Sequence, residues 1–326
     1  MTADRPARST RRAGPGPLWL AALAILLAGQ WPHWTVWGAQ LSYSRGQGMS
    51  PAFEGWEQAA DGSRYFLFGY MNRNWEEEFD IPVGRDNNIE PGGPDQGQPT
   101  HFFPRRNPFV FRIRVPGNFG EKDELVWTLT THGQTERAYA TLKADYFVDD
   151  LVRAMELGAV IGGNALDPEI YRNQGPTLKV DGEKRRSAEV GQAVTLVAWA
   201  ADDGIPKRRG ARKLPGPGGD AKYSPPNQGI LTNPTGLRLS WFVYRGAGKV
   251  TFSPEQTKVW QDTRPDANSP WAPFWAPPPV PSDGKWVVQA SFDEPGEYVV
   301  RCLASDGALL AYEDLTISVI GRENRK

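Results

Sequence analysis

Apolar and polar residues alternate along the C-terminal part of the chain in a way that predicts antiparallel β-strands. In the segment 298–304, Tyr298, Val300 and Cys302 fall on one face and Arg301 lies between them, as in a strand with one buried and one solvent-facing side. Turn residues bound this segment at 295–296 (Pro-Gly) and 306–307 (Asp-Gly). Similar apolar runs occupy 286–292 and 314–319. The pattern therefore predicts three consecutive strands that close a β-sandwich.

Upstream of these strands, runs of aromatic and β-branched residues predict further strands in two groups. The first group lies at 64–70, 109–115, 125–130 and 138–142, and the second begins at 193–200 and 237–244. Between the groups, Phe147, Leu151 and Met155 recur every four residues, which predicts a short helix with one apolar face. We therefore expect an all-β fold of two antiparallel β-sandwich domains joined by a short helical linker.

The expected domain boundaries follow from these elements. We predict an N-terminal β-sandwich at 43–142, a partly helical linker at 143–176 and a second β-sandwich at 177–320. Two long Gly/Pro-rich segments, 205–236 and 253–284, interrupt the second sandwich as loop insertions. Loops of this length inside a compact domain are typically either functional or disordered.

The N-terminus has the features of an export signal. Four arginines precede the apolar run 18–28, which is shorter than the ~20 residues that a membrane-spanning helix needs. The sequence has no clear cleavage site, because Trp37 and Leu26 stand where a small residue is preferred. We expect residues 1–39 to be a signal peptide or an uncleaved anchor, and the protein to be exported to the periplasm, the cell surface or the medium.

Composition narrows the class of protein further. The 35 Gly, 29 Pro and 13 Trp suit an all-β protein with long surface loops. The 37 basic and 38 acidic side chains nearly balance, which gives no reason to expect a nucleic-acid partner. Cys302 is the one cysteine in the sequence, so an intramolecular disulfide is excluded and the thiol is expected to be a small buried group.

Several motifs of the second group lie at the positions expected in an immunoglobulin-like sandwich. They are Gly191 before one strand, Asp-Asp-Gly at 202–204 after it, Trp241 in the next strand, Pro-Gly-Glu-Tyr at 295–298 and Ser-Asp-Gly at 305–307. With these motifs the region 177–320 resembles PKD-type and related immunoglobulin-like repeats of exported bacterial proteins, and the layout of the whole chain resembles exported bacterial proteins without an assigned role. The resemblance implies a module for spacing, adhesion or protein contact, a class that seldom carries catalysis.

Acidic residues at 76–80 are the first candidate site. If 74–82 is a strand, Glu76, Glu78 and Asp80 share one face at a repeat of ~6.8 Å. Carboxylates with this spacing could act as an acid–base pair or bind a hard cation. The alternative is a solvent-exposed face whose charge is balanced by nearby arginines.

The segment 85–105 holds further candidates. We expect no cofactor, because Asx and glycine are ordinary turn residues and the segment lacks the spacing of a known calcium loop. Its density of oxygen ligands leaves calcium as the alternative, with Asp86, Asn88 and Glu90 as the candidate ligands. Asp95, His101 and Arg105 are the remaining candidate ligand-binding residues, since His101 and the aromatic residues after it could line a pocket for an anionic or sugar ligand. The sequence contains neither Gly-x-Ser-x-Gly nor His-x-x-x-His, so no residue is assigned a catalytic role.

Tryptophans in the second insertion suggest a carbohydrate ligand. Trp271 and Trp275 could stack on the apolar side of a sugar ring, or they could pack as a loop core. The leading interpretation is an exported, non-enzymatic β-sandwich protein that contacts a protein or another component of the cell envelope. The alternative is a carbohydrate-binding or carbohydrate-active protein with a glycan as its partner.

Overall fold

The computed structural model describes residues 45–74, 76–159, 168–208, 235–256 and 279–321, and these residues belong to one compact unit. The predicted export signal and the tryptophans Trp271 and Trp275 lie outside the described residues. Within the described ranges, no helix has the length and apolar character needed to cross a membrane.

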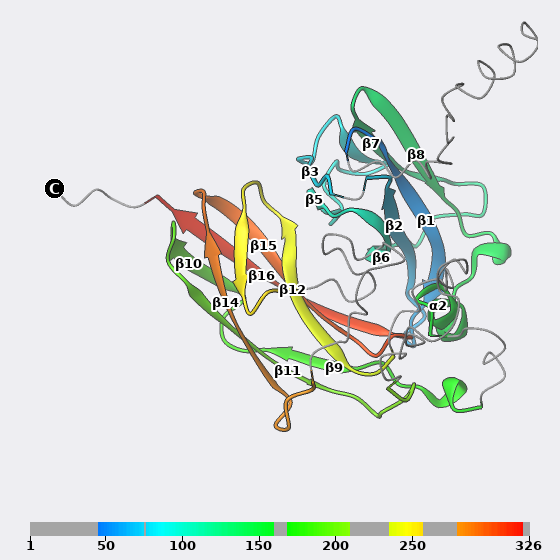
Figure 1. Cartoon of the computed structure of the whole chain (residues 1–326). Coiled ribbons are helices and arrows are strands. Elements are labelled where there is room, and N and C mark those ends of the chain that lie inside the picture. Colours follow the sequence, from blue (N-terminus) through cyan, green and yellow to red (C-terminus); the bar gives the residue numbers. More distant parts are fainter. Residues whose placement is uncertain (1–44, 75, 160–167, 209–234, 257–278, 322–326) are drawn as a thin grey trace, which may run out of the picture. The chain divides into compact units, whose positions relative to one another are not determined.

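The first part of the described chain consists of β-strands in small antiparallel sheets (Figure 1). The strands are β1 (Met49–Gln58), β2 (Arg64–Asn72), β3 (Phe79–Asp80), β4 (Asn87–Glu90), β5 (His101–Phe102), β6 (Arg105–Arg114), β7 (Leu125–Thr131) and β8 (Gln134–Ala140). Sheets β1-β2-β6 and β4-β7-β8 enclose a core in which Phe68 and Phe111 contact the indole of Trp127. Strands β3 and β5 pair separately. We call these strands the first sandwich.

The second part forms two four-stranded sheets that face each other across a core of aliphatic and aromatic side chains. Its strands are β9 (Thr177–Val180), β10 (Arg185–Glu189), β11 (Val194–Ala201), β12 (Arg238–Arg245), β13 (Val250–Ser253), β14 (Lys285–Phe292), β15 (Gly296–Ser305) and β16 (Leu310–Ile320). One sheet has the order β13-β14-β11-β9 and the other β10-β16-β15-β12. We call these strands the second sandwich.

This strand order is that of an immunoglobulin-like sandwich, with β9, β11, β14 and β13 in the places of strands A, B, E and D, and β12, β15 and β16 in those of C, F and G. Trp241 is buried on the C-equivalent strand, as the fold requires. The Tyr298 hydroxyl donates to the carbonyl of Glu294 at 3.0 Å, close to the tyrosine corner of that fold. The predicted all-β fold is confirmed, with one departure: β10 pairs with β16 in parallel.

The predicted solvent-facing side of β15 is buried, which corrects the sequence interpretation. One face of β15 places Tyr298, Val300 and Cys302 in the core between the two sheets, as expected. The other face carries Arg301 and Leu303, which are only 4% and 2% exposed. Residues of the first sandwich cover that face, so period-2 alternation here does not mark a boundary with water.

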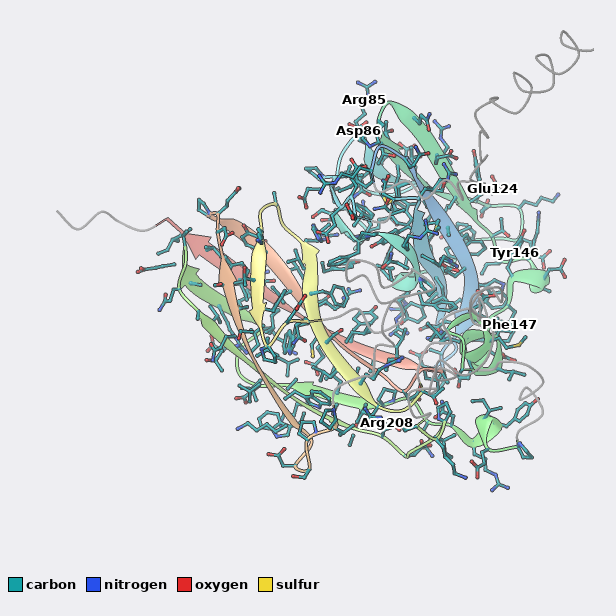
Figure 2. All side chains as sticks on the ribbon, viewed as in Figure 1. Arg85, Asp86, Glu124, Tyr146, Phe147 and Arg208 are labelled. Carbon is teal, nitrogen blue, oxygen red and sulfur yellow. The ribbon has the colours of Figure 1, made fainter. Side chains whose placement is uncertain are left out.

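The predicted helix exists but has a different buried face. Helix α2 (Asp150–Glu156) begins after Asp149, whose carboxylate accepts from the Val152 amide as an N-cap. It buries Ala154, whereas Met155 is 52% exposed. Phe147 precedes the helix, is 46% exposed and lies at the surface near Tyr146 (Figure 2). The 3-10 turns η1 (Ala144–Tyr146) and η3 (Ile170–Arg172) complete the described part of this region, and the domain boundaries within the chain stay a prediction.

Candidate functional site

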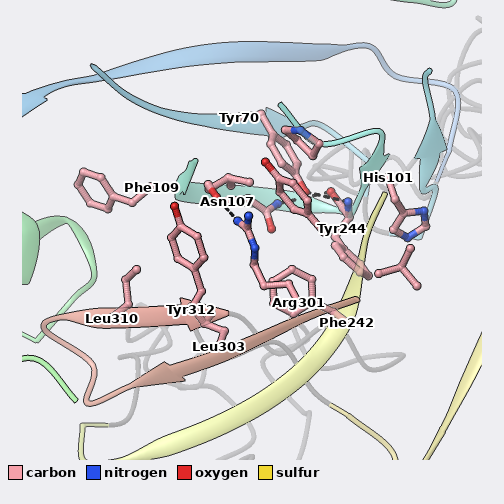
Figure 3. Close-up of a pocket in the computed structure, with 14 residues that line it drawn as sticks. Tyr70, His101, Asn107, Phe109, Phe242, Tyr244, Arg301, Leu303, Leu310 and Tyr312 are labelled. Atoms are coloured by element: carbon pink, nitrogen blue, oxygen red, sulfur yellow. Dashed lines mark hydrogen bonds between the residues drawn. The ribbon is translucent and has the colours of Figure 1, made fainter. Parts of the chain in front are cut away.

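The guanidinium of Arg301 is a buried cation on the face of β15 that meets the first sandwich (Figure 3). Its Nε and Nη2 donate to both carboxylate oxygens of Asp314 on β16, at 2.7 and 2.8 Å. Its Nη1 donates to the carbonyl of Val110 on β6, at 2.5 Å. The plane of the guanidinium lies between two aromatic rings, with Cζ 3.5 Å from the ring centroid of Tyr244 and 4.0 Å from that of Tyr312. One side chain thus connects strands of both sandwiches.

Burial by itself lowers the pKa of Arg301, but the surroundings reverse that effect. Tyr244 and the carboxylate of Asp314 favour the charged form, and the net result is a pKa raised above the usual value for arginine. The guanidinium is therefore a permanent buried cation, and each of its three nitrogens donates to the Asp314 carboxylate or to the Val110 carbonyl. Such an ion is strongly destabilising when one partner is lost, because the remaining charge stays desolvated.

A second set of contacts joins the end of β12 to the loop before β5. The Tyr244 hydroxyl donates to the carbonyl of Gly97, and the Thr100 amide donates to the carbonyl of Tyr244 at 3.1 Å. Arg245 binds both carboxylate oxygens of Asp95, at 2.7 and 3.0 Å, and donates from Nε to the carbonyl of Gln98. The hydrogen bonds from Arg245 hold the pKa of Asp95 below its usual value. Together with Arg301 and its partners, these residues form what we call the junction.

Side-chain amides hold the loop 87–99 in shape on the first-sandwich side of the junction. Asn87, which is fully buried, donates to the carbonyls of Ile81 and Pro99 and accepts from the indole of Trp127. Gln96 and Gln98 donate from their amide nitrogens to further carbonyls of the loop. These amides satisfy backbone carbonyls that a metal ion would otherwise be free to bind.

His101 brings two of the predicted carboxylates together. Its Nδ1 lies 2.8 Å from Asp80 Oδ1 and its Nε2 lies 3.3 Å from Glu78 Oε2. Burial lowers the pKa of His101, but the hydrogen bonds to Asp80 and Glu78 outweigh it and raise the pKa to about 9. The imidazole is therefore protonated at neutral pH and pairs with two half-exposed carboxylates.

The continuous acidic strand expected at 74–82 is not present in the described residues. Only Phe79 and Asp80 of the described part of this segment form a strand. Glu77 accepts from the Gly46 amide and lies 3.1 Å from Nε2 of His132, so the acidic segment contacts two different histidines. Glu76 is exposed. The carboxylates of this segment therefore face two different partners: Glu78 and Asp80 pair with His101, and Glu77 pairs with His132.

Backbone strain concentrates on β6, beside the junction. Arg105 and Phe109 have positive φ angles of 63° and 51°, which non-glycine residues rarely adopt. Between them, the buried amide of Asn107 donates to the carbonyls of Phe103, Pro104 and Arg105. Arg105 donates from Nη1 to the carbonyl of Arg73. This local geometry places the Val110 carbonyl in front of Arg301.

The space between the junction residues is too small for an organic ligand. The cavity lined by Tyr70, His101, Phe242, Tyr244 and Arg301 has a volume of about 20 Å³ (Figure 3). That volume accommodates about one water molecule, whereas small-molecule sites are about 300 Å³ or larger. Of the residues that the sequence suggested as a pocket, His101 and Phe103 line this small cavity; a ligand at these residues stays a prediction.

The remaining candidates are dispersed. Asn88 and Glu90 lie on β4 and Asp86 lies just before it, and no group of three or more His, Cys, Asp or Glu side chains that could hold a metal occurs in the described part of the chain. Calcium at Asp86, Asn88 and Glu90, the alternative to ordinary turns, stays untested. Trp271 and Trp275 lie outside the described residues, so the glycan-stacking prediction there stays untested.

Sequence reasoning missed the residues that carry the junction. Arg301, Asp314, Tyr244 and Tyr312 were not among the candidate residues. The sequence does contain a signal for burial of this face. Arg301 is flanked on its face of β15 by Val299 and Leu303, so both faces of the strand carry apolar residues. A strand that is apolar on both faces is typical of burial on both sides.

Comparisons with known proteins give no family or function for this chain. Neither a protein-family model nor a curated protein sequence matches the chain. Among solved structures, domains 4 and 5 of the S-layer protein SbsC are 8% identical, with 61% of this chain and 65% of that chain covered and a TM-score of 0.23. The fibronectin(III)-like modules of Clostridium thermocellum CbhA are 8% identical, with coverage of 85% and 94% and a TM-score of 0.22.

A titin I-band fragment, I67-I69, is also 8% identical, with 84% of this chain and 64% of that chain covered and a TM-score of 0.22. The chain thus covers less than two thirds of the S-layer and titin fragments. The class assigned here, an immunoglobulin-like β-sandwich protein, rests on the strand order of the second sandwich and not on these matches.

Proposed function

We propose that this chain is an exported, non-enzymatic immunoglobulin-like protein that serves as a rigid contact module in the cell envelope. The observation that carries the proposal is the junction. Two sandwiches joined by a flexible linker would present their surfaces independently, whereas Arg301 and Arg245 tie strands of one to backbone carbonyls of the other. A fixed arrangement of two sandwiches suits a spacer or scaffold.

Two further features support this function over catalysis. The buried charges of the junction are paired with each other and with backbone carbonyls, so they act in packing. The cavity at the junction has room for about one water molecule. The apolar run at 18–28 behind a basic flank supports export, and a PKD-type relationship of the second sandwich is consistent with a contact role.

The experiment is cell fractionation of a bacterium that produces the full chain. We expect the protein in the envelope fraction, and we expect a membrane-impermeant amine label added to the periplasm or to intact cells to reach its exposed lysines. A matched chain without residues 1–39 should stay in the cytosol. Recovery of the full chain in the cytosol, unlabelled, would contradict the proposal.

The enzyme alternative has its own discriminating result. If purified protein hydrolyses a polysaccharide and Glu78→Gln abolishes that activity while leaving the unfolding midpoint unchanged, the carboxylates at His101 are catalytic and the non-enzymatic assignment is wrong. We expect no hydrolysis, because Glu78 and Asp80 are both engaged with His101.

A further inference from the structure

The outer face of the sheet β13-β14-β11-β9 carries an aromatic residue between two cations. Trp199 on β11 lies directly opposite Lys285 on β14 and Lys179 on β9. The three side chains therefore form one row across three neighbouring strands. The flanking residues Ala198 and Ala200 point into the core, which places Trp199 on the outer face. The ammonium of Lys285 lies 5.9 Å from the centroid of the Trp199 ring.

The adjoining rows give this face both apolar and hydrogen-bonding character. Val197 pairs with Val287, which is 48% exposed. In the row beyond, Thr195 and Gln289 hydrogen-bond to each other at 3.0 and 3.2 Å and remain exposed to solvent. A tryptophan ring, a valine pair and a hydroxyl–amide pair thus follow one another along the strands at the ~6.8 Å repeat of alternate residues.

The charges on this face favour an anionic partner. Lys179 and Lys285 are both exposed, and the guanidinium of Arg186 lies at the same end as Thr195, to whose carbonyl it donates. Asp181, two residues after Lys179 and just past the end of β9, is acidic, and its backbone carbonyl also accepts from Arg186. Asp283, whose carboxylate accepts from the Lys285 amide, adds a second negative charge beside the row. With three cations and two carboxylates, the face carries an excess of one positive charge, whereas the whole chain has a net charge of −1.

We propose that the row Lys179-Trp199-Lys285 binds an acidic polysaccharide, with a uronic-acid ring stacked on Trp199 and its neighbouring carboxylates paired with the two lysines. The apolar C–H face of a sugar ring complements an indole face, and carboxylates on either side of that ring complement cations placed one strand away on each side, ~4.8 Å in each direction. Thr195 and Gln289 supply donors and acceptors for sugar hydroxyls. The observations favour a carboxylated glycan over a neutral one because the aromatic residue is flanked by lysines on both sides.

This inference goes beyond the proposed contact function, which a protein partner would satisfy equally well. If the glycan assay shows no binding, the proposals of export and envelope location are unaffected. If the fractionation experiment finds the protein in the cytosol, the contact function is wrong, but glycan binding by this face is still testable. The two experiments fail independently.

The test is isothermal titration calorimetry of the full chain, kept in a mild detergent, with hexagalacturonate as the probe. We expect binding that weakens as salt is raised, since exposed ion pairs are screened, and no binding of the fully methyl-esterified hexamer. Trp199→Ala should weaken binding by about tenfold or more, the loss expected when an aromatic anchor is truncated. Lys179→Gln with Lys285→Gln should weaken it and flatten the salt dependence.

Matched controls lie on β8 and just after it, away from the proposed site. Tyr139→Ala removes an aromatic residue that is 52% exposed, and Lys143→Gln removes an exposed lysine; both should bind as the parent chain does. Trp199→Phe keeps a ring and should retain more affinity than Trp199→Ala, which separates stacking from misfolding when circular dichroism and the unfolding midpoint are compared.

Three results would overturn the inference. They are no binding of hexagalacturonate at millimolar concentration, equal binding of the methyl ester, or equal loss in the Tyr139→Ala control. Sedimentation equilibrium of the same variants tests whether a second copy of the chain occupies this face instead. If the parent chain is a dimer that Trp199→Ala dissociates, and no glycan binds, the face is a dimer interface.

Discussion

Substitution of Arg301 by methionine should be among the most destabilising single changes in the described chain. The change keeps much of the volume of the side chain but removes the cation. It leaves the Asp314 carboxylate, which is 35% exposed, without its bidentate partner, and it leaves the Val110 carbonyl without a donor. Two aromatic contacts to the cation are lost as well.

The expected magnitude follows from the burial of the group. Removing one partner of a buried ion pair costs about 3–5 kcal/mol, and partial exposure of Asp314 places this case toward the lower end. A desolvated cation–π contact contributes about 2 kcal/mol, but that loss overlaps with the first. We therefore expect the free energy of unfolding to fall by about 3–4 kcal/mol.

Arg112 provides a matched control. It also binds a carboxylate, with Nη1 3.0 Å from Glu57, and its guanidinium lies 4.3 Å from the ring centroid of Tyr65. Its side chain, however, is 50% exposed. Arg112→Met should cost at most about 1 kcal/mol, because water screens the exposed pair.

The assay is urea unfolding of both variants and of the double variant Arg301→Met/Asp314→Leu, followed by circular dichroism and by tryptophan fluorescence. Two sandwiches coupled through the junction should unfold together in the parent chain, and Arg301→Met should separate the fluorescence and circular-dichroism transitions. The double variant should recover part of the loss, since a buried pair replaced by apolar side chains is often tolerated. Equal losses for Arg301→Met and Arg112→Met would refute the reasoning.

Three further predictions follow from other parts of the structure. Because the pKa of His101 is raised from 6.5 to about 9, the stabilisation by this residue is complete below pH 6.5 and is lost as pH rises through about 9. The free energy of unfolding, from urea titrations at pH 6 and pH 9.5, should therefore fall more in the parent chain than in His101→Gln, by an amount on the order of 2–3 kcal/mol after allowance for the exposed carboxylates. Gly69→Ala should lower the free energy of unfolding by about 2 kcal/mol or more, because a Cβ there would lie 2.4 Å from the Asn107 carbonyl oxygen and 2.0 Å from Glu54 Oε1. Gly117→Ala, with open space around the added Cβ, should be nearly neutral when both variants are compared by thermal unfolding. Calcium should leave the thermal midpoint unchanged, because amides of Gln96 and Gln98 already satisfy loop carbonyls; a rise of several degrees that a chelator reverses would instead assign an ion to Asp86, Asn88 and Glu90.

Much of the second sandwich could be predicted from the sequence because its strands have strong local signals. The β15 segment lies between Pro-Gly and Asp-Gly turns and alternates cleanly, so its inner face was correctly assigned. Trp241 marked the third strand of the immunoglobulin-like fold in the same way. Strand β10, by contrast, contains Arg185, Arg186 and Glu189 and forms because it adds to the edge of β16, a long-range pairing with no local pattern.

In the first sandwich, β1 was not predicted because Pro51 and Gly55 interrupt its apolar pattern. The structure accommodates them with a register shift between Phe53 and Gly55, and a Cβ at Gly55 would clash with the Tyr146 carbonyl at 2.4 Å. Glycine is therefore required where another segment approaches the strand closely. Such irregular strands are defined by their neighbours in space, which the sequence pattern does not report.

The candidate site was less predictable than the fold. His101, Glu78 and Asp80 were each identified, and the structure brings the three together, but the pairing joins segments 21 residues apart. Arg301 was taken as solvent-facing because local alternation cannot distinguish water from a second packed layer. The Val299 and Leu303 side chains beside it held the information that this face is covered.

The most direct test of the central claim measures whether the two sandwiches keep one relative arrangement. Spin labels at Tyr139→Cys on β8 and Thr251→Cys on β13, in a chain with Cys302→Ala, would report the distance between them by double electron–electron resonance. The junction predicts one narrow distance distribution, which Arg301→Met broadens and Arg112→Met leaves narrow. A broad distribution in the parent chain would contradict the account of a rigid contact module.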